Sequence, residues 1–195
     1  MRDTYLENKL HILLVGRRLI AQKGFASVGL SEILSAAAVP KGSFYHYFGS
    51  KEQYGLELIE HYVAEYLHML DGILGQPGPA RERLLAYWGH WLETQCCDAV
   101  EHKCLVVKLS AEVADMSDAM RLALHHGTQA FIGRLAALIA AGVEDTSLHP
   151  ALEPASTAQL LYQLWLGASL LSKLSRDRQP LQAAMDVTLR VLIAP

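Results

Sequence analysis

Two groups of residues in this 195-residue sequence carry side chains suited to binding or chemistry. The first is the stretch PKGSFYHYFGSK at residues 40–51, which mixes amines, hydroxyls and an imidazole with aromatic rings. Such donors, together with free backbone N–H groups, contact phosphate oxygens in nucleic acids. The second group is three cysteines, Cys96, Cys97 and Cys104, whose thiolate form is a nucleophile. The sequence therefore offers one stretch that suits a polyanion and one that suits covalent reaction.

The stretch at 40–51 has the pattern of a short helix that faces DNA. Pro40 suits the first helical position, because its missing N–H has no helical partner there. Phe44 and Phe48, four residues apart, are expected to anchor the helix on the core, whereas an ordinary amphipathic turn would leave Tyr45 to Tyr47 unexplained. A helix N-terminus also favours an anion through its dipole. The residues predicted to contact DNA are Ser31, Lys41, Gly42, Ser43, Tyr45, His46 and Lys51.

Apolar residues recur at helical spacing almost throughout the chain, which predicts an all-α fold of nine helices. The third helix starts at Pro40, and the seventh is capped by Ser117. The other helices are expected at about 4–23, 30–37, 51–74, 80–97, 104–115, 155–176 and 180–193, with the seventh ending near 143. Two short helices joined by about three residues make a helix-turn-helix. We expect a DNA-binding domain at 1–50 and an effector-sensing and dimerisation domain at 51–195, with 51–74 as connector.

Composition and charge bound the class of protein. The hydrophobic fraction of 51% is ordinary for a globular chain, and no apolar run reaches the roughly 20 residues that span a bilayer. The net charge is −3, but residues 1–55 carry seven basic and four acidic side chains, a net +3, and the remainder carries a net −6. A basic N-terminal module fits a phosphate-facing role. We expect a cytoplasmic protein with reduced thiols, without a membrane partner.

The predicted helix at 155–176 is apolar over more than half of its surface, which favours burial from two sides. We predict a homodimer through the last two helices. The interface residues are expected to be Leu161, Leu164, Ala168 and Leu171. The alternative is a central helix of a monomer.

Three segments closely resemble the TetR family of bacterial transcription regulators. They are GF at 24–25, LSEILSAAAV at 30–39 and KGSFYHYFGSKE at 41–52. The resemblance implies a homodimeric repressor that binds a palindromic double-stranded DNA operator through its first three helices, and whose helices five to nine bind an effector. Two positions depart from the family pattern: Ala38 stands where a turn glycine is usual, and Pro40 where a serine is common.

Two further segments, 102–121 and 161–176, look like the TetR subgroup that responds to electrophiles and oxidants, the N-ethylmaleimide type. That resemblance implies that Cys104 is the sensing residue and that Lys173 lies near it. We expect the helix dipole to favour the thiolate of Cys104, with added positive charge from His102, Lys103 and Lys108. The predicted protein is thus a repressor released from DNA by modification at Cys104. The alternative role for Cys104 is that of a small buried hydrophobe.

Three other readings of the sequence stay open or are excluded. Trp88, Trp91, Tyr162 and Trp165 are either ordinary core or the lining of a pocket for a reversible apolar effector. A metal site at Cys97, His102 and Cys104, with His90 or Asp98, lacks the spacing of known motifs, so we expect neither metal nor cofactor. An enzyme is not favoured, because the sequence has no nucleophile and base pair, phosphate-binding glycine loop or paired carboxylates.

Overall fold

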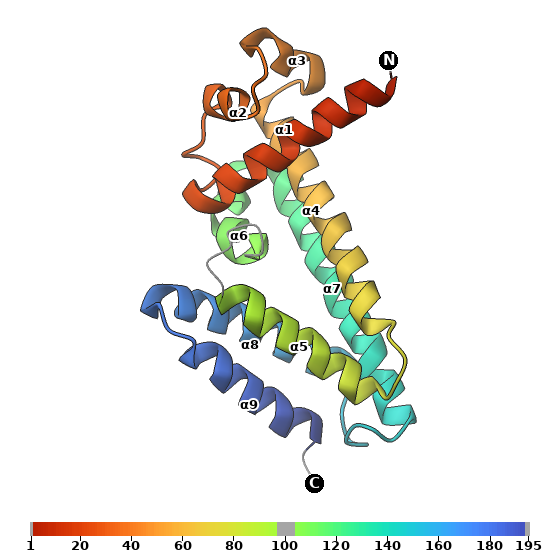
Figure 1. Cartoon of the computed structure of the whole chain (residues 1–195). Coiled ribbons are helices and arrows are strands. Elements are labelled where there is room, and N and C mark those ends of the chain that lie inside the picture. The colour runs from red at the N-terminus through yellow and green to blue at the C-terminus, as the bar shows by residue number, and fades with distance from the viewer. Residues whose placement is uncertain (1, 97–103, 194–195) are drawn as a thin grey trace. The chain divides into compact units, whose positions relative to one another are not determined.

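The computed structural model describes residues 2–96 and 104–193, which contain nine α-helices, one short 3-10 helix and no strand (Figure 1). The prediction of an all-α, nine-helix fold is confirmed for these residues. In the same part of the chain, no helix is long and apolar enough to cross a membrane. The helices are α1 (Arg2–Lys23), α2 (Leu30–Ala36), η1 (Lys41–Ser43), α3 (Phe44–Tyr47), α4 (Lys51–Leu74), α5 (Ala80–Cys96), α6 (Leu105–Met116), α7 (Asp118–Glu144), α8 (Pro154–Ser175) and α9 (Gln179–Ile193).

The third helix differs from its prediction at its start. Pro40 is the residue before η1 and has extended backbone angles, with φ −57° and ψ 142°. The N–H of Ser43 donates to the carbonyl of Pro40 at 2.9 Å, which is a 3-10 bond. Gly42 and Ser43 are weak helix formers, so the α-helix proper begins only at Phe44. The stretch at residues 40–51, called the recognition segment from here on, therefore contains one 3-10 turn followed by one α-helical turn.

The chain packs as two compact units. The first contains α1, α2, η1, α3, α4 as far as Ala64, α6, and α7 as far as His126. The second contains α4 from Glu65, α5, α7 from Gly127, α8 and α9. The helix α6 therefore packs with the N-terminal helices, although it is distant from them in sequence. The predicted domain boundary between residues 50 and 51 had assigned α6 to the second domain.

Aromatic and β-branched side chains form the core of the first unit. Phe44 and Phe48 are each 1% exposed, which confirms that they anchor the recognition segment. Tyr54 of α4 is fully buried, and its hydroxyl donates to the carbonyl of Ile12 in α1 at 3.3 Å. Burial raises the pKa of this phenol well above its usual range. Gly16 allows the close approach, because a Cβ there would lie 1.8 Å from the Tyr54 hydroxyl oxygen.

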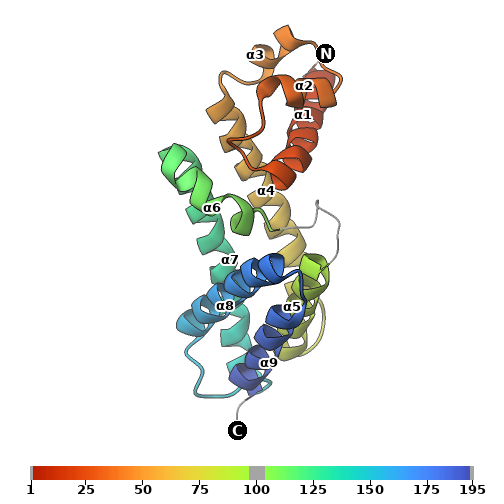
Figure 2. The same cartoon turned by 90° about the vertical axis from the view of Figure 1, so that its left-hand side faces the viewer.

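In the second unit, α5, α8 and α9 lie side by side in both views (Figures 1 and 2). The indole N–H of Trp165 in α8 donates to the hydroxyl of Thr188 in α9 at 2.9 Å, and both residues are fully buried. Glu153 caps the start of α8, where its carboxylate accepts the N–H groups of Ala155 and Ser156 at 3.3 and 2.7 Å. These contacts fix the helix that carries the predicted interface.

Candidate nucleic-acid interface and sensor cysteine

The recognition segment places most of its predicted DNA contacts on its outer face. Tyr45 is 69% exposed, while Gly42 and His46 are also exposed and Ser43 is half-buried. Ser31 is exposed in the first turn of α2. The side chain of Lys41 lies outside the described part of the structure. The described side chains can therefore reach a groove without disturbing the core below them.

Lys51 has partners within the protein. Its ammonium donates to the carbonyl of Ala26 at 3.4 Å and lies 4.8 Å from the ring centroid of Phe25. Both partners belong to the connection between α1 and α2. A phosphate contact by Lys51 stays a prediction, and it would compete with a cation–π contact worth about 0.5–1 kcal/mol at an exposed site.

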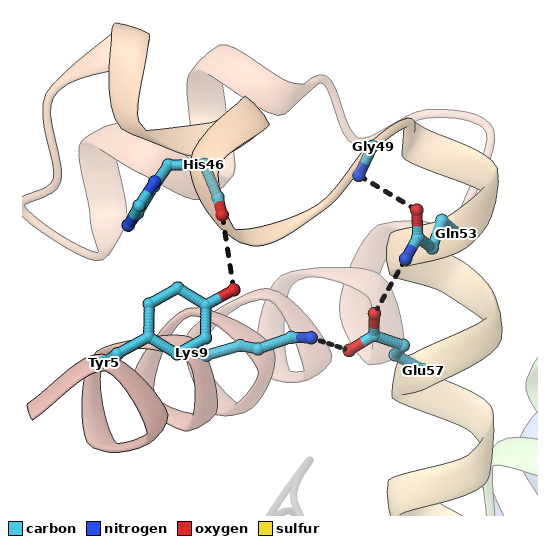
Figure 3. Close-up of polar contacts among 6 residues, drawn as sticks. All are labelled: Tyr5, Lys9, His46, Gly49, Gln53 and Glu57. Carbon is cyan, nitrogen blue, oxygen red and sulfur yellow. Dashed lines mark hydrogen bonds and ion pairs between the residues drawn. The ribbon is translucent and has the colours of Figure 1, made fainter. Parts of the chain in front are cut away.

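Side chains of α1 and α4 hold the backbone of the recognition segment near its C-terminal end (Figure 3). The hydroxyl of Tyr5 donates to the carbonyl of His46 at 3.3 Å. The side-chain oxygen of Gln53 accepts the N–H of Gly49 at 3.0 Å. Neither Tyr5 nor Gln53 belongs to a motif, so neither was predictable from the sequence as a positioning residue.

An ion pair supports the Gln53 contact from below (Figure 3). The amide nitrogen of Gln53 donates to Glu57 at 3.3 Å, and Glu57 pairs with Lys9 of α1 at 2.6 Å. Lys9 also lies 5.2 Å from the ring centroid of Phe48. The only sequence signal for this relay was the helical spacing of Gln53 and Glu57. Through Gln53, this arrangement links α1 and α4 to the backbone at Gly49, where the recognition segment leads into α4.

Cys104 is the residue immediately before α6 and is 6% exposed. The hydroxyl of Tyr62 in α4 donates to its sulfur at 3.6 Å. Burial raises the pKa of the Cys104 thiol, and the nearby Val107 N–H, the Tyr62 hydroxyl and the Val106 N–H oppose that rise only in part. The expectation that the helix dipole favours the thiolate is therefore wrong for this conformation, because desolvation of the charged sulfur outweighs it.

None of the three cations expected around Cys104 is seen beside its sulfur among the described residues. The ammonium of Lys108 donates to the carbonyl of Gln22 at 3.2 Å, and His102 and Lys103 lie outside the described residues. The guanidinium of Arg17 in α1 instead lies 5.4 Å from the ring centroid of Tyr62. Tyr62 therefore contacts both Cys104 and α1.

The other residues considered for sensing or metal binding are scattered. Lys173 is exposed on α8, in the second unit, so its proximity to Cys104 stays a prediction. His90 is exposed on α5. The described residues contain no cluster of His, Cys, Asp and Glu that could hold a metal ion. Cys97, Asp98 and His102, together with the side chain of Cys96, fall outside the described part.

The four aromatic residues predicted to line a pocket form one buried cluster in the second unit. Trp88 stacks on Trp165 with centroids 4.9 Å apart, and Trp91 meets Tyr162 edge-on at 5.7 Å. None is more than 3% exposed. Trp91 donates its indole N–H to Ser169 at 2.9 Å, and Trp165 donates to Thr188. The indole N–H of Trp88, by contrast, has no acceptor among the described residues.

Two of the four predicted interface residues are buried within the protomer. Leu161 is fully buried and Ala168 is 6% exposed, so neither is available to a partner. The prediction assigned them to the wrong face, because apolar spacing alone does not distinguish a protomer core from an interface. The outward stripe of α8 consists of Leu160, Leu164, Gly167, Leu171 and Leu174.

Comparisons with known proteins agree along the whole chain. Residues 12–54 match the family described as bacterial regulatory proteins, tetR family, and residues 79–188 match the tetracyclin repressor-like C-terminal domain. The HTH-type transcriptional repressor NemR of Escherichia coli (strain K12) is 40% identical over 195 residues, covering 100% of this chain and 98% of that protein. The transcriptional regulator AcuR of Cereibacter sphaeroides is 34% identical, covering 88% and 79%.

The same relative is found among solved structures. The crystal structure of the reduced form of E. coli NemR superposes with a TM-score of 0.91 and 42% identity, covering 97% of this chain and 98% of that one. These relatives are transcriptional regulators and not enzymes. Repressors of this kind bind DNA operators and act as dimers with small-molecule effectors. With a helix-turn-helix match followed by a match to the C-terminal domain, this protein belongs to the TetR family of bacterial DNA-binding transcription regulators.

Proposed function

We propose that this protein is a homodimeric repressor that leaves a palindromic operator when an electrophile or oxidant modifies Cys104. The observation that carries the proposal is the position of Cys104. It directly precedes α6, in the same compact unit as the helix-turn-helix, and its sulfur accepts a hydrogen bond from the hydroxyl of Tyr62. The 40% identical relative is a repressor, and a structure of its reduced form is known. A repressor acts on the chromosome, so we expect this one in the cytoplasm.

The reaction at Cys104 is an addition without a leaving group. The sulfur attacks the activated C=C of a quinone or maleimide, a C–S bond forms, and the thiol proton ends on the carbon beside the carbonyl. At 6% exposure the site has no room for an adduct, since a packed interior holds few voids larger than a water molecule. The first turn of α6 must then move. The raised pKa keeps the resting thiol unreactive until the segment opens transiently.

An oxidant acts at the same sulfur by a different route. Hypochlorous acid takes two electrons from the thiol, giving the sulfenic acid, chloride and a proton. We propose that the Lys173 amine then attacks the sulfenic sulfur, forming an S–N bond and releasing water. Mass spectrometry of the oxidised protein would reveal that cross-link as a loss of water joining the two peptides. Lys173→Arg should abolish the cross-link while leaving alkylation of Cys104 unchanged.

The dimer is proposed to form through the outward stripe of α8, together with α9. Leu160 and Leu171 are 55% and 56% exposed, and Leu174 is 73% exposed. Leu171 lies about three helical turns after Leu160, and Leu174 about one turn after Leu171, so the three side chains lie on a single face. At Gly167 an added Cβ would meet no atom within 4 Å, so a partner helix can approach closely there. A two-fold dimer reads two half-sites whose centres lie about 34–36 Å apart, or a multiple of that distance, which predicts a palindromic operator.

Operator release is the direct test of the main proposal. Wild-type protein treated with N-ethylmaleimide or a quinone should lose operator affinity, whereas Cys104→Ser should keep it under the same treatment. Cys96 and Cys97 remain in that variant, so they serve as internal controls. Equal release of both proteins would eliminate sensing at Cys104. For the interface, Leu171→Glu should yield a monomer at micromolar concentration by light scattering, and Gln163→Glu, exposed on another face of α8, should not.

A second candidate function is release by a reversible ligand, favoured by the indole N–H of Trp88. A buried donor without an acceptor costs about 1–3 kcal/mol, and a ligand carrying a carbonyl or ether oxygen would recover part of this. Trp88→Phe keeps an aromatic ring but removes the donor. If the reversible ligand is the effector, Trp88→Phe should weaken induction, and Cys104→Ser should leave it unchanged. The opposite pattern would favour covalent sensing.

A further inference from the structure

The carboxylate of Glu112 in α6 binds the backbone that connects α1 to α2. One oxygen accepts the N–H of Phe25 at 2.9 Å, and the other accepts the N–H of Ala26 at 2.5 Å. Both donors lie just beyond the end of α1. Hydrogen bonds between an ionised carboxylate and backbone N–H groups are roughly twice as strong as neutral ones. One side chain of α6 therefore holds two successive residues of the DNA-binding segment.

Lys108 makes a complementary contact one turn earlier on α6. Its ammonium donates to the carbonyl of Gln22, in the last turn of α1, at 3.2 Å. Carbonyls of a last helical turn lack intrahelical donors and carry partial negative charge. The α6 surface thus presents a cation to carbonyls and an anion to N–H groups at the same junction.

Glycine at position 24 makes room for this contact. A Cβ on Gly24 would lie 3.0 Å from a carboxylate oxygen of Glu112. Gly24 also has φ +92°, a left-handed conformation that favours glycine. A residue with a side chain at position 24 would therefore crowd the Glu112 carboxylate where it binds the N–H groups of Phe25 and Ala26.

Cys104 directly precedes α6, and the residues that make the two contacts lie on one face of that helix. Lys108 and Glu112 are four residues apart, and the extended Cys104 is tied to the first turn by its carbonyl, which accepts the N–H of Lys108 at 3.3 Å. Eight residues of helix span about 12 Å. A turn, tilt or shift of α6 that starts at Cys104 therefore displaces both contacts together.

The anchored connection is itself packed on the rest of the DNA-binding segment. Phe25 is 2% exposed, and its ring fills the space beside Gly55 of α4, where a Cβ would lie 2.6 Å from the ring. The ammonium of Lys51, at the start of α4, donates a hydrogen bond to the carbonyl of Ala26. The connection also sets where α2 begins, and α2 leads directly into the recognition segment.

We propose that Glu112 is the positioning residue through which α6 carries the state of Cys104 to the DNA-binding helices. This inference rests on the proposed function. In the reduced protein, the Glu112 carboxylate holds the connection between α1 and α2 in the DNA-binding arrangement. When an adduct at Cys104 moves α6, the Glu112 carboxylate releases the N–H groups of Phe25 and Ala26, and the connection is no longer held in that arrangement.

Glu112→Gln tests this role with nearly the same side-chain volume. Glutamine keeps one acceptor oxygen but turns an NH₂ donor toward a backbone N–H. Asp115→Asn is the matched control, because Asp115 is exposed on the same helix and the change removes the same charge. For each protein, the Cys104 adduct is quantified by mass spectrometry, and operator Kd is measured before and after N-ethylmaleimide.

We expect equal adduct formation in all three proteins. The ratio of the two Kd values should be about 5–150 for wild type and Asp115→Asn, the range of typical allosteric coupling, and should approach one for Glu112→Gln. A merely structural role would lower thermal stability and leave the ratio unchanged. If alkylated wild type keeps its affinity, sensing at Cys104 itself is wrong. If wild type releases DNA and Glu112→Gln shows the same ratio, the role of Glu112 alone is overturned.

Hydrogen exchange on wild type provides a test that does not depend on folding of the variant. The N–H groups of Phe25 and Ala26 should exchange slowly in the reduced protein and at least several-fold faster after alkylation of Cys104. Unchanged protection in an alkylated protein that has released its operator would overturn the inference.

Discussion

The hydroxyl of Tyr62 donates to the sulfur of Cys104 across 3.6 Å and joins the middle of α4 to the start of α6. That bond is one of the influences that lower the thiol pKa against the larger effect of burial. Tyr62→Phe should therefore raise the pKa further and reduce the thiolate fraction at a given pH. We expect alkylation to slow by about threefold, corresponding to a hydrogen bond at the weak end of the usual range. The pH dependence of the N-ethylmaleimide reaction measures this, and unchanged or faster alkylation would refute the role of the hydroxyl.

The second prediction concerns Ala38, which stands where the family usually has glycine. Its φ is +55°, in the left-handed region, and this conformation costs a residue with a Cβ about 1–2 kcal/mol. Ala38→Gly should stabilise the protein by about 1 kcal/mol, read from urea unfolding. Ala86→Gly, at an exposed position inside α5, should destabilise it by about the same amount. The same sign for both changes would contradict the explanation.

The third prediction concerns the contact between α1 and α4. Gly16→Ala would place a Cβ 1.8 Å from the Tyr54 hydroxyl and 3.2 Å from Ile33, so Tyr54 must shift and lose its bond to α1. We expect a loss of about 1–3 kcal/mol, as for other overpacked cores. Gly89→Ala in α5, where a Cβ meets nothing within 4 Å, should instead be neutral or stabilising. The thermal unfolding midpoints of Gly16→Ala and Gly89→Ala test this prediction, and equal midpoints would exclude the clash with Tyr54.

The fourth prediction separates DNA contact from folding in the recognition segment. Tyr45→Ala removes a side chain that is 69% exposed, so it should weaken operator binding and leave the unfolding midpoint nearly unchanged. Phe44→Ala removes a side chain that is 1% exposed and should cost about 3–5 kcal/mol of stability. Operator titration and calorimetry on both proteins check the pair. Unchanged binding by Tyr45→Ala would remove Tyr45 from the interface.

The fifth prediction concerns acid stability. The hydroxyl and N–H of Ser147 and the N–H of Ala80 lower the pKa of Asp145 below its ordinary value of 3.8. Because the pKa is lower in the folded protein than in the unfolded chain, the ionised carboxylate stabilises the fold at any pH above the pKa of the unfolded chain. This contribution is lost as the pH falls through the pKa of the folded protein. Asp145→Asn should therefore be less stable than wild type at pH 6, with the difference shrinking toward pH 3. A difference independent of pH would exclude the linkage.

Local patterns predicted most helices closely, because helical periodicity and end signals are short-range. The segment Gly75 to Pro79 interrupts the chain where α4 ends and α5 begins, and Ser117 lies directly before α7, as expected. Gly24, which follows the last residue of the first predicted helix, has the left-handed backbone that is common for a glycine at that position. Pro40 was the exception, because a proline suits both the first position of a helix and the position before a 3-10 turn.

The candidate sites were harder to predict, since they depend on which face each helix turns inward. Leu161 and Leu171 carry the same apolar signal, yet one is fully buried and the other is 56% exposed. Cys104 was located correctly at the start of α6, but its raised pKa depends on burial by helices distant in sequence. Neither difference is visible in spacing alone.

The sequence by itself determined the all-α class, the helix-turn-helix and the position of Cys104 at a helix start, because each follows from residue types within a few turns of chain. Only the tertiary structure decided that α6 packs with the DNA-binding helices, that Tyr62 covers the thiol, and that Glu112 binds the N–H groups of Phe25 and Ala26. Those contacts join residues 42 to 87 positions apart. Their geometry results from the packing of whole helices, which local sequence preferences do not specify.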